Sequence, residues 1–506
     1  MMTESLRDYL SELGYTVPYN YFDLISFLEK KYEYSSRDAL QVIGSDVVFT
    51  YQELFEEVYK FSGILSENLY KTDTVCLVWL KDLSFIVANF SIWKVQGATA
   101  PLNDLSDDDT SKYIDWISPQ LVVSSYEMIL KDYSLGIQGS IWGSALYFYV
   151  KTHWLPQHMN LPKEVALIAF TSGTTWPSKW VLLSHENLIS MSIAMWEAIQ
   201  ESSSKNIFIP VSLSHMYGMS VTLTYLLNWN CISIAQSPST ISEALTKAQE
   251  FHIDAIALQP RHFIELIEKP ELFEKINAHC RFIACASGNL SEKDMVTIRQ
   301  KLKTDMYVYF ALSEVPRAVF CKNPQLRHED DIMTIWLPSK FMNLNIVSPR
   351  TIHDTENVWE IVLVWSMVAL WYIYQNWEMS FFQNKTFHTG DLWYMKHGTY
   401  FWYGRIKDII NIRDIIYINP FVIEKEMLKT WWIKECLLMF DAKIQWLIFC
   451  FCKATDVPLW DSIRTKLEEL IWIDFVASDI DCQILEVSVI QKNKNWKILR
   501  DPLFYL

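Results

Sequence analysis

A hydroxyl-rich loop followed by a lysine is the segment of this chain best suited to chemistry. An apolar run ends at Phe170, and Lys179 follows nine residues later. The five residues directly after Phe170 supply four hydroxyl side chains and one glycine: Thr171, Ser172, Gly173, Thr174 and Thr175. Backbone N–H groups and hydroxyls in a tight loop can surround phosphate oxygens, and a lysine adds a positive charge. Since the GxxxxGK[ST] spacing of a Walker A loop is absent, the segment is either another kind of phosphate loop or a polar surface loop.

Alternating strands and helices must position this loop. Short apolar runs predict strands at 74–79, 121–124, 165–170, 207–210, 231–235, 255–258, 282–286 and 306–310. Amphipathic stretches predict helices at 51–69, 84–95, 241–251 and 291–302. Such alternation over the first 300 or so residues is typical of an α/β sheet layered by helices. From about residue 349 to 403 the sequence becomes strand-rich, and the remainder is long enough for a small α+β domain.

Composition limits the class of protein. The chain has 506 residues, of which 50% are hydrophobic and 20% charged, with a net charge of −15. It is too apolar to be disordered and long enough for two domains. The acidic balance argues against a nucleic-acid binder, which needs a basic face. The apolar stretch 361–374 is shorter than the roughly 20 residues of a membrane span, and its β-branched residues predict two buried strands.

The N-terminus and the cysteines indicate a cytoplasmic protein. The first fifteen residues, MMTESLRDYLSELGY, contain no basic segment followed by an apolar one, so no secretory signal is predicted. The nine cysteines are odd in number and scattered, without a CxxC pair or a Cys/His ligand spacing. They therefore predict buried free thiols in a reducing compartment.

Seven segments, in order, resemble the signatures of the adenylate-forming (ANL) superfamily of acyl-CoA synthetases, acyl-AMP ligases, luciferases and adenylation domains. The hydroxyl loop is similar to (Y/F)TSGTTGxPKGV. The others are PVSLSHMYG at 210–218 (similar to PLxHxxG), RFIACASGNL at 281–290 (RxxxSGGAPL), YFALSE at 309–314 (YGxTE), HTGDL at 388–392 (RTGDL), GRIKD at 404–408 (GRxKD) and KNWKILR at 494–500 (NGKIxR). Seven matches in the same order make chance a poor explanation.

The resemblance implies an architecture and a reaction. Residues 1–404 would form the AMP-binding domain of layered α/β sheets with a strand-rich subdomain. Residues 405–506 would form a small α+β lid that turns about Asp408 between two reaction steps. In the first step a carboxylate attacks ATP, with Mg²⁺, to give acyl-AMP and pyrophosphate. In the second step a thiol, of coenzyme A or of a carrier protein's phosphopantetheine, takes the acyl group.

The resemblance also assigns roles to residues. The phosphates would be held by Thr171, Ser172, Gly173, Thr174, Thr175 and Lys179. Adenine would bind in a slot formed by Gly288, Asn289, Tyr309 and Phe310, although the departure from YGx leaves open which aromatic ring stacks on the base. Ser313 would lie near the α-phosphate, and Glu314 would bind Mg²⁺, unless Glu314 is an ordinary helix-capping acid.

The remaining roles concern the ribose, the acyl group and the lid. Asp391 would accept the ribose hydroxyls, with Arg405 as a nearby cation. Lys497 would supply a proton-donating cation to the reacting carboxylate and phosphate. His215 would line the acyl-carboxylate side, unless it is a satisfied core residue. Members that activate amino acids have an aspartate near 211–215, which reads VSLSH here, so a fatty or aryl acid is favoured.

Tryptophan stands where the family has glycine. The chain has 13 Gly and 22 Trp, whereas roughly 35 Gly would be usual at this length. Tryptophan occupies family glycine positions at 176, 180, 336, 359, 365, 371, 393 and 496. Tight loops use glycine for positive φ or close backbone approach, which an indole prevents. Our hypothesis is that the source reads the UGA codon as glycine. The alternatives are deliberate mutagenesis and a divergent relative that binds a nucleotide or acyl group without catalysis.

Overall fold

The computed structural model divides the described chain into two compact units. It describes residues 4–12, 23–29, 35–44, 47–66, 74–80, 82–103, 105–152, 161–170, 179–199, 204–235, 241–288, 290, 292–316, 319–322, 334–335, 337–338, 342–347, 358–364, 366–373, 379–396, 399–412, 416–430, 432–441, 446–453, 460–471, 481–491 and 500. The first unit comprises Met1–Leu344 and Leu363–Phe387, and the second Asn345–Val362 and His388–Leu506. The division into residues 1–404 and 405–506, with a hinge at Asp408, stays a prediction.

The first sheet of the first unit has a parallel centre. Nine described strands run in the order β17-β15-β14-β13-β12-β10-β11-β1-β2. Their bounds are β17 (Leu337–Pro338), β15 (Val319–Lys322), β14 (Asp305–Phe310), β13 (Phe282–Cys285), β12 (Ala255–Leu258), β10 (Asn206–Phe208), β11 (Cys231–Ala235), β1 (Asp38–Ile43) and β2 (Val47–Thr50). From β14 to β1 every neighbouring pair is parallel. The strands are almost wholly buried, as expected of a parallel sheet covered on both faces.

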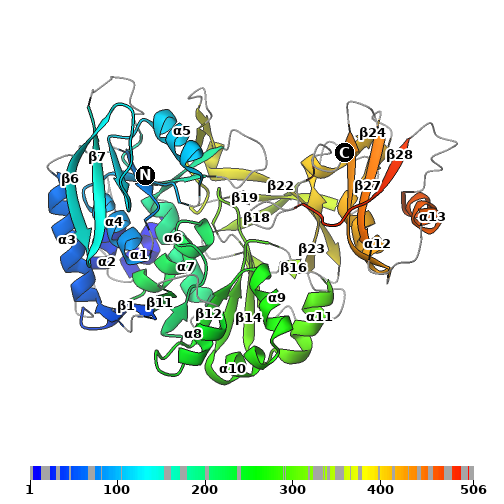
Figure 1. The fold of residues 1–506 in the computed structure, drawn as a ribbon, viewed down its shortest axis with the longest axis horizontal. Coiled ribbons are helices and arrows are strands. Elements are labelled where there is room, and N and C mark those ends of the chain that lie inside the picture. Colours follow the sequence, from blue (N-terminus) through cyan, green and yellow to red (C-terminus); the bar gives the residue numbers. More distant parts are fainter. Residues whose placement is uncertain are drawn as a thin grey trace. The chain divides into compact units, whose positions relative to one another are not determined.

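Helices cover this sheet through apolar faces. Figure 1 shows four of them around β12 and β14: α8 (Ile241–Lys247), α9 (Pro260–Glu268), α10 (Glu271–His279) and α11 (Glu292–Lys301). Phe263 of α9 and Phe273 of α10 join Ile256 and Met306 of the strands in one buried core. Pro260 at the first position of α9 suits a helix start, where its missing N–H is no loss.

The chain reverses its direction of travel across this sheet at β10. From β10 it passes to β11 on one side, and then to β12, β13 and β14 on the other. The carboxyl ends of these parallel strands meet at one edge. In open α/β sheets, ligands bind outside the carboxyl ends at such a switch point. The loops after β10, β12, β13 and β14 therefore define the edge where a site is expected.

A second sheet in the first unit carries the two strands that flank the hydroxyl-rich loop. Its order is β21-β20-β9-β8-β4-β3-β5-β7-β6. The bounds are β21 (Met379–Phe381), β20 (Trp371–Ile373), β9 (Trp180–Ser184), β8 (Val165–Phe170), β4 (Ala98–Pro101), β3 (Thr74–Val78), β5 (Leu121–Ser124), β7 (Ser144–Lys151) and β6 (Tyr133–Ile141). Strands β8 and β9 are antiparallel, with Phe170 opposite Trp180, so residues 171–179 connect them.

The other helices of this unit are α1 (Glu4–Glu12), α2 (Leu24–Glu29), α3 (Tyr51–Ser66), α4 (Asp82–Lys94), α5 (Asp107–Ile117), α6 (His185–Ile199) and α7 (Met216–Leu227), and β16 (Thr334–Ile335) is a further short strand. Helix α3 buries Leu54, Phe55 and Val58 along one face. Trp93 of α4 is wholly buried, and its Nε1 donates a hydrogen bond of 2.7 Å to the carbonyl of Ala166. The indole at 93 is thus satisfied in the core.

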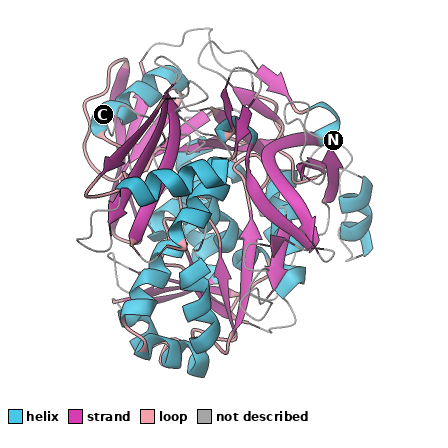
Figure 2. Cartoon of the chain, turned by 90° about the vertical axis from the view of Figure 1, so that its right-hand side faces the viewer, coloured by secondary structure: helices cyan, strands magenta, loops and turns pink. Residues whose placement is uncertain are grey.

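The second unit is smaller and β-rich. Its strands are β18 (Asn343–Val347), β19 (Val358–Val364), β22 (Thr386–Lys396), β23 (Thr399–Arg405), β24 (Ile410–Ile412), β25 (Ile416–Ile418), β26 (Ile433–Asp441), β27 (Trp446–Lys453) and β28 (Cys482–Glu486). Helices α12 (Pro420–Leu428) and α13 (Trp460–Ile471) contribute Ile423, Met427 and Leu467 to a core with β26 and β27. Figure 2 colours the helices and strands of both units by type.

The predicted fold class is confirmed. Strands predicted at 121–124, 165–170, 231–235 and 255–258 have those bounds in the structure. The stretch 361–374 contains β19 and β20, although these strands belong to different sheets. The hairpin of β6 and β7 was not predicted. None of the helices in the described part of the chain combines the length and apolar character needed to cross a bilayer. Eight of the nine cysteines are free thiols, and all of these but the half-buried Cys482 are buried.

Candidate functional site

The switch-point edge of the first sheet gathers several of the predicted site residues. His215 follows β10, Gly288 follows β13, and Ser313 and Glu314 follow β14. These strands are parallel, so the loops leave the sheet at the same edge. The structure thus brings together residues that lie far apart in the sequence, at the edge where α/β sheets bind ligands.

His215 caps helix α7. Its Nδ1 accepts a hydrogen bond of 3.2 Å from the backbone N–H of Tyr217, and the ring is half-buried. In the neutral ring the proton therefore lies on Nε2, which could donate to a carboxylate. Gly218 allows the tight turn, because a Cβ there would lie 2.2 Å from the carbonyl oxygen of Ser212. The helix cap is shown, and contact with an acyl carboxylate stays a prediction.

The two aromatic residues of the predicted adenine slot face opposite sides of β14. Tyr309 and Phe310 are consecutive strand residues, so their side chains alternate. Tyr309 is buried, whereas Phe310 is half-buried at the strand's carboxyl end. Gly288 is exposed beyond the neighbouring strand, and a Cβ there would lie 3.2 Å from Cγ of Pro260. Only one of the two rings can therefore lie beside a base bound at this edge.

Lys179 and Glu314 contact the same tyrosine. The Nζ of Lys179 lies 5.0 Å from the ring centroid of Tyr372, and the Tyr372 hydroxyl donates a hydrogen bond to Oε1 of Glu314. The backbone N–H of Ala369 also donates to the Glu314 carbonyl, at 2.8 Å. Tyr372 was not predicted as a site residue. The only sequence signal was its place directly after Trp371, where the family has a GY pair.

Asp391 is a buried carboxylate with one unsatisfied oxygen. It is 1% exposed, and its Oδ1 accepts hydrogen bonds from Arg405 Nε at 2.9 Å and Trp402 Nε1 at 3.4 Å. Within the described residues, Oδ2 is buried without a hydrogen-bond partner. Burial raises the pKa of Asp391, and the charge of Arg405 opposes this shift. A buried acceptor without a donor is rare in folded proteins, and it fits a ligand that brings hydroxyl groups.

A second carboxylate, Glu360, was not predicted from the sequence and holds the part of β22 directly before Asp391. Glu360 Oε1 accepts from the backbone N–H of Gly390 at 2.9 Å, and Glu360 Oε2 lies 3.0 Å from Nδ1 of His388. Gly390 has a φ of +68°, which glycine adopts without strain. Glu360 thereby holds the irregular strand backbone directly before Asp391. The sequence signal was the glutamate of the family's GEI motif, which directly follows the tryptophan at 359.

The last site residues lie around the predicted hinge. Asp408 ends a short 3-10 helix, Ile406–Asp408, directly after β23. Arg500, which is half-buried, forms a two-pronged ion pair with the buried Glu424 of α12, with N–O distances of 2.6 and 2.8 Å. Arg500 also donates to the carbonyl of Leu438 at 3.1 Å. The chain just after the predicted Lys497 is thus fastened to the second unit.

Several predicted residues lie outside the described residues. These are Thr171, Ser172, Gly173, Thr174, Thr175, Asn289 and Lys497, together with the tryptophans at 176, 336, 365 and 496. Their roles remain predictions. Within the described residues no group of three or more His, Cys, Asp or Glu side chains could hold a metal ion. Mg²⁺ is usually bound by one or two carboxylates together with substrate phosphates, so Glu314 alone fits such an ion.

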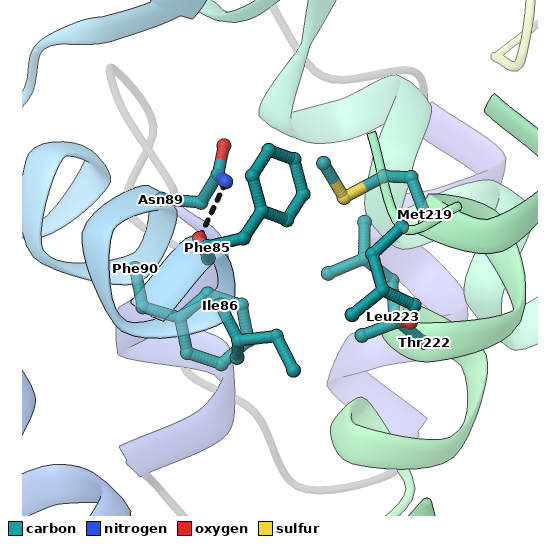
Figure 3. Close-up of a pocket in the computed structure, with 8 residues that line it drawn as sticks. Phe85, Ile86, Asn89, Phe90, Met219, Thr222 and Leu223 are labelled. Carbon is teal, nitrogen blue, oxygen red and sulfur yellow. Dashed lines mark hydrogen bonds between the residues drawn. The ribbon is translucent and has the colours of Figure 1, made fainter. Parts of the chain in front are cut away.

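A small apolar cavity lies between α4 and α7. Figure 3 shows Phe85 of α4 and Met219 of α7 facing each other across it, and Leu213 also lines it. Asn89 donates to the carbonyl of Phe85 at 2.7 Å. The cavity is too small for an acyl chain and therefore does not identify the acid.

Comparisons with known proteins identify the family of this chain. The AMP-binding enzyme family matches residues 28–357. The 2-succinylbenzoate–CoA ligase of Staphylococcus aureus is 25% identical over 262 residues, which are 52% of this chain and 51% of the ligase. A mycosubtilin synthase polypeptide of Bacillus subtilis is 26% identical over 166 residues, 32% of this chain and 6% of that polypeptide. The chain therefore spans about half the length, or less, of these relatives.

Solved structures share the fold over nearly the whole chain. ATP-bound MatB from Rhodopseudomonas palustris has a TM-score of 0.75 at 15% identity, covering 96% of this chain and 98% of MatB. O-succinylbenzoate coenzyme A synthetase (MenE) from Bacillus subtilis, in complex with AMP, has a TM-score of 0.73 at 16% identity, covering 94% and 97%. With the family matched over more than half of its length, the chain belongs to the AMP-binding enzymes of the adenylate-forming superfamily.

Proposed function

We propose that this chain activates a carboxylic acid as acyl-AMP and transfers the acyl group to a thiol. The observation that carries the proposal is the convergence of Lys179 and Glu314 on Tyr372. A cation for phosphate oxygens and a carboxylate for Mg²⁺ are the two charges that an ATP-using site requires. Family membership and the unsatisfied Asp391 oxygen support the same assignment.

The first step joins two anions, a carboxylate and a triphosphate. A carboxylate oxygen attacks the α-phosphorus, the bond to the β-phosphate oxygen breaks, and pyrophosphate leaves. Lys179 and the hydroxyl loop bind the departing phosphates, and Lys497 neutralises charge at the reacting oxygens. Asp391 orients the ribose through its free oxygen. Bound Mg²⁺ would lower the repulsion between the phosphates, with Glu314 as its protein ligand.

The second step forms a thioester. The thiol sulfur attacks the acyl carbonyl carbon, the bond to the AMP oxygen breaks, and the thiol proton is lost. Residues 405–506 act as the lid that turns about Asp408, removing Lys497 after the first step and admitting the thiol. The reaction belongs in the cytoplasm, where ATP is available and free thiols stay reduced.

The acid is a non-amino acid of the fatty or aryl type. No aspartate lies between 211 and 215 to hold an ammonium group. Coenzyme A is the favoured acceptor, because the relative named 2-succinylbenzoate–CoA ligase matches half of this chain, whereas the mycosubtilin synthase polypeptide matches a third. A carrier-protein phosphopantetheine is the second candidate acceptor.

Pyrophosphate release over a panel of fatty, aryl and amino acids tests this proposal. The protein should have glycine at 176, 180 and 496. We expect release that depends on Mg²⁺ and on one class of non-amino acid, and thioester formation with coenzyme A. If the protein binds AMP but no acid triggers release, the chain is a nucleotide-binding relative without catalysis.

The D391N variant should separate nucleotide binding from stability. Because burial raises the pKa of Asp391, the ionised carboxylate disfavours the folded state above that pKa, and this penalty disappears as pH falls through it. An amide there should therefore leave the melting temperature at neutral pH unchanged or higher. It should also raise the KM for ATP about tenfold, through loss of an acceptor for the ribose.

The matched control is D461N, on the exposed face of α13 in the same unit. This variant should change neither the melting temperature nor the KM for ATP. An unaltered KM in D391N would show that the carboxylate does not contact the nucleotide.

A further inference from the structure

Tyr372 lies where strand pairing brings its ring under Lys179. Strand β20 pairs with β9 in an antiparallel register that places Tyr372 opposite Val181. Lys179 is two residues before Val181, so both side chains are on the face of the sheet that carries Tyr372. The distance of 5.0 Å from Nζ to the ring centroid is that of a cation–π contact.

The hydroxyl of the same side chain orients Glu314. The Tyr372 hydroxyl donates a hydrogen bond to Oε1 of Glu314. Three residues before Tyr372, the backbone N–H of Ala369 donates to the Glu314 carbonyl. Phe382 packs edge-on against the Tyr372 ring, at 4.8 Å between centroids, and so restrains it. A carboxylate with one oxygen fixed by a neutral donor keeps its charge and directs its second oxygen toward a cation.

From this geometry we propose that Tyr372 is a positioning residue for Mg·ATP, an inference that rests on the proposed function. The ring holds the Lys179 ammonium on the face of the sheet where the phosphates would bind. The phenol keeps Glu314 in the orientation that binds the metal. One side chain thereby fixes the relative position of the two opposite charges.

Two substitutions separate the role of the Tyr372 hydroxyl from that of its ring. Y372F removes only the hydroxyl, and Y372L removes the ring as well. In the chain with glycine at 176, 180 and 496, Y372F should weaken Mg·ATP binding, measured by calorimetry, by roughly tenfold, and should raise the Mg²⁺ concentration for half-maximal pyrophosphate release. Binding of AMP without metal should be unchanged. Y372L should in addition weaken binding of pyrophosphate.

The matched control is Y126F. Tyr126 donates to Asp107 at 3.1 Å, so the substitution removes a tyrosine–carboxylate hydrogen bond elsewhere in the same unit. Mg·ATP bound equally well by Y372F and the parent chain would overturn the inference. A parent chain that itself neither binds Mg·ATP nor releases pyrophosphate would instead overturn the proposed function.

An independent observation concerns the tryptophans, three of which have the backbone conformation of glycine. Trp79, Trp142 and Trp229 have φ values of 52°, 44° and 56°. Positive φ is a genuine outlier for so bulky a residue. The three positions are typical glycine sites, and none of them was identified from the sequence.

Two of these sites are turns with strict requirements. Trp142 and Gly143 form the two-residue loop between β6 and β7, both with positive φ, as in a type I′ turn. Trp229 follows α7, where its N–H and that of Asn230 bond back to Leu226 and Tyr225. This is the left-handed position that usually ends a helix with glycine. Trp180 adds a buried Nε1 without an acceptor in the described chain, and its ring centroid lies 3.7 Å from that of Trp116.

We infer that the functional protein has glycine at 79, 142 and 229, encoded by UGA codons, and tryptophan at 93. The codons of the gene and the peptide masses of the protein from its source test this. We expect UGA and the glycine mass at the three positions, and UGG and the tryptophan mass at 93. UGG codons or tryptophan masses at all three would overturn the inference. In recombinant protein W142G should keep or raise the melting temperature, whereas W93G should lower it.

Discussion

Glycine in place of Trp176, Trp180 and Trp496 is expected to raise the rate of acyl-adenylate formation at least about a hundredfold. Trp176 directly follows the hydroxyl loop in the sequence, Trp180 is wholly buried at the start of β9, and Trp496 directly precedes Lys497. Displacement of reacting groups by one indole is well beyond the roughly 1 Å that already costs about a hundredfold in rate. Acid-dependent pyrophosphate release by the triple variant and the unaltered chain measures the difference.

The control for this experiment is W93G, which changes the same residue type in a helix. Trp93 is fully buried and donates to Ala166, so its removal should leave a cavity and lower stability by about 3 to 5 kcal/mol without any gain in rate. If the triple variant is no faster than the chain with tryptophan, the indoles are not obstructing a phosphate loop.

Loss of Lys497 should slow the first half-reaction much more than the second. We expect K497A to slow acyl-AMP formation by roughly a hundredfold to a thousandfold, because a preorganised cation at the developing charge contributes on that order. Thioester formation from supplied acyl-AMP should change by no more than about threefold, since the lid has then removed this lysine. Single-turnover assays of each step, with K494A as the neighbouring control, give the comparison.

The attachment of the chain next to Lys497 supports this expectation. Arg500, three residues later, is held by Glu424 and Leu438. Three peptide units span at most about 11 Å, so we expect Lys497 to travel with residues 405–506 when they turn about Asp408. Equal losses in both half-reactions would contradict a role confined to the first.

The core strands could be predicted because their apolar runs are short, buried and bounded by polar loops. Strands such as β8 and β11 therefore have the predicted ends. The β6–β7 hairpin was missed for two physical reasons. Most of β6 is exposed, so its apolar signal is weak, and the turn joining it to β7 carries Trp142 where a glycine would have marked it.

From the sequence, site residues could be predicted only where they lie in one of the seven segments that resemble family motifs. His215, Glu314 and Asp391 were predicted from their resemblance to family motifs. Tyr372 and Glu360 contact predicted site residues or their neighbours in the chain. Such contacts depend on strand register and side-chain direction, which a sequence motif does not contain. The sequence likewise does not show that Oδ2 of Asp391 is buried without a hydrogen-bond partner among the described residues, because this depends on the packing around it.

The fate of carboxylate oxygen tests the central claim most directly. A substrate acid labelled with ¹⁸O in its carboxylate is turned over with ATP and coenzyme A, and the AMP is analysed by mass spectrometry. Attack of the carboxylate on the α-phosphorus predicts one labelled oxygen in AMP and none in pyrophosphate. Unlabelled AMP, or label in inorganic phosphate together with ADP, would contradict adenylation as the chemistry of this chain.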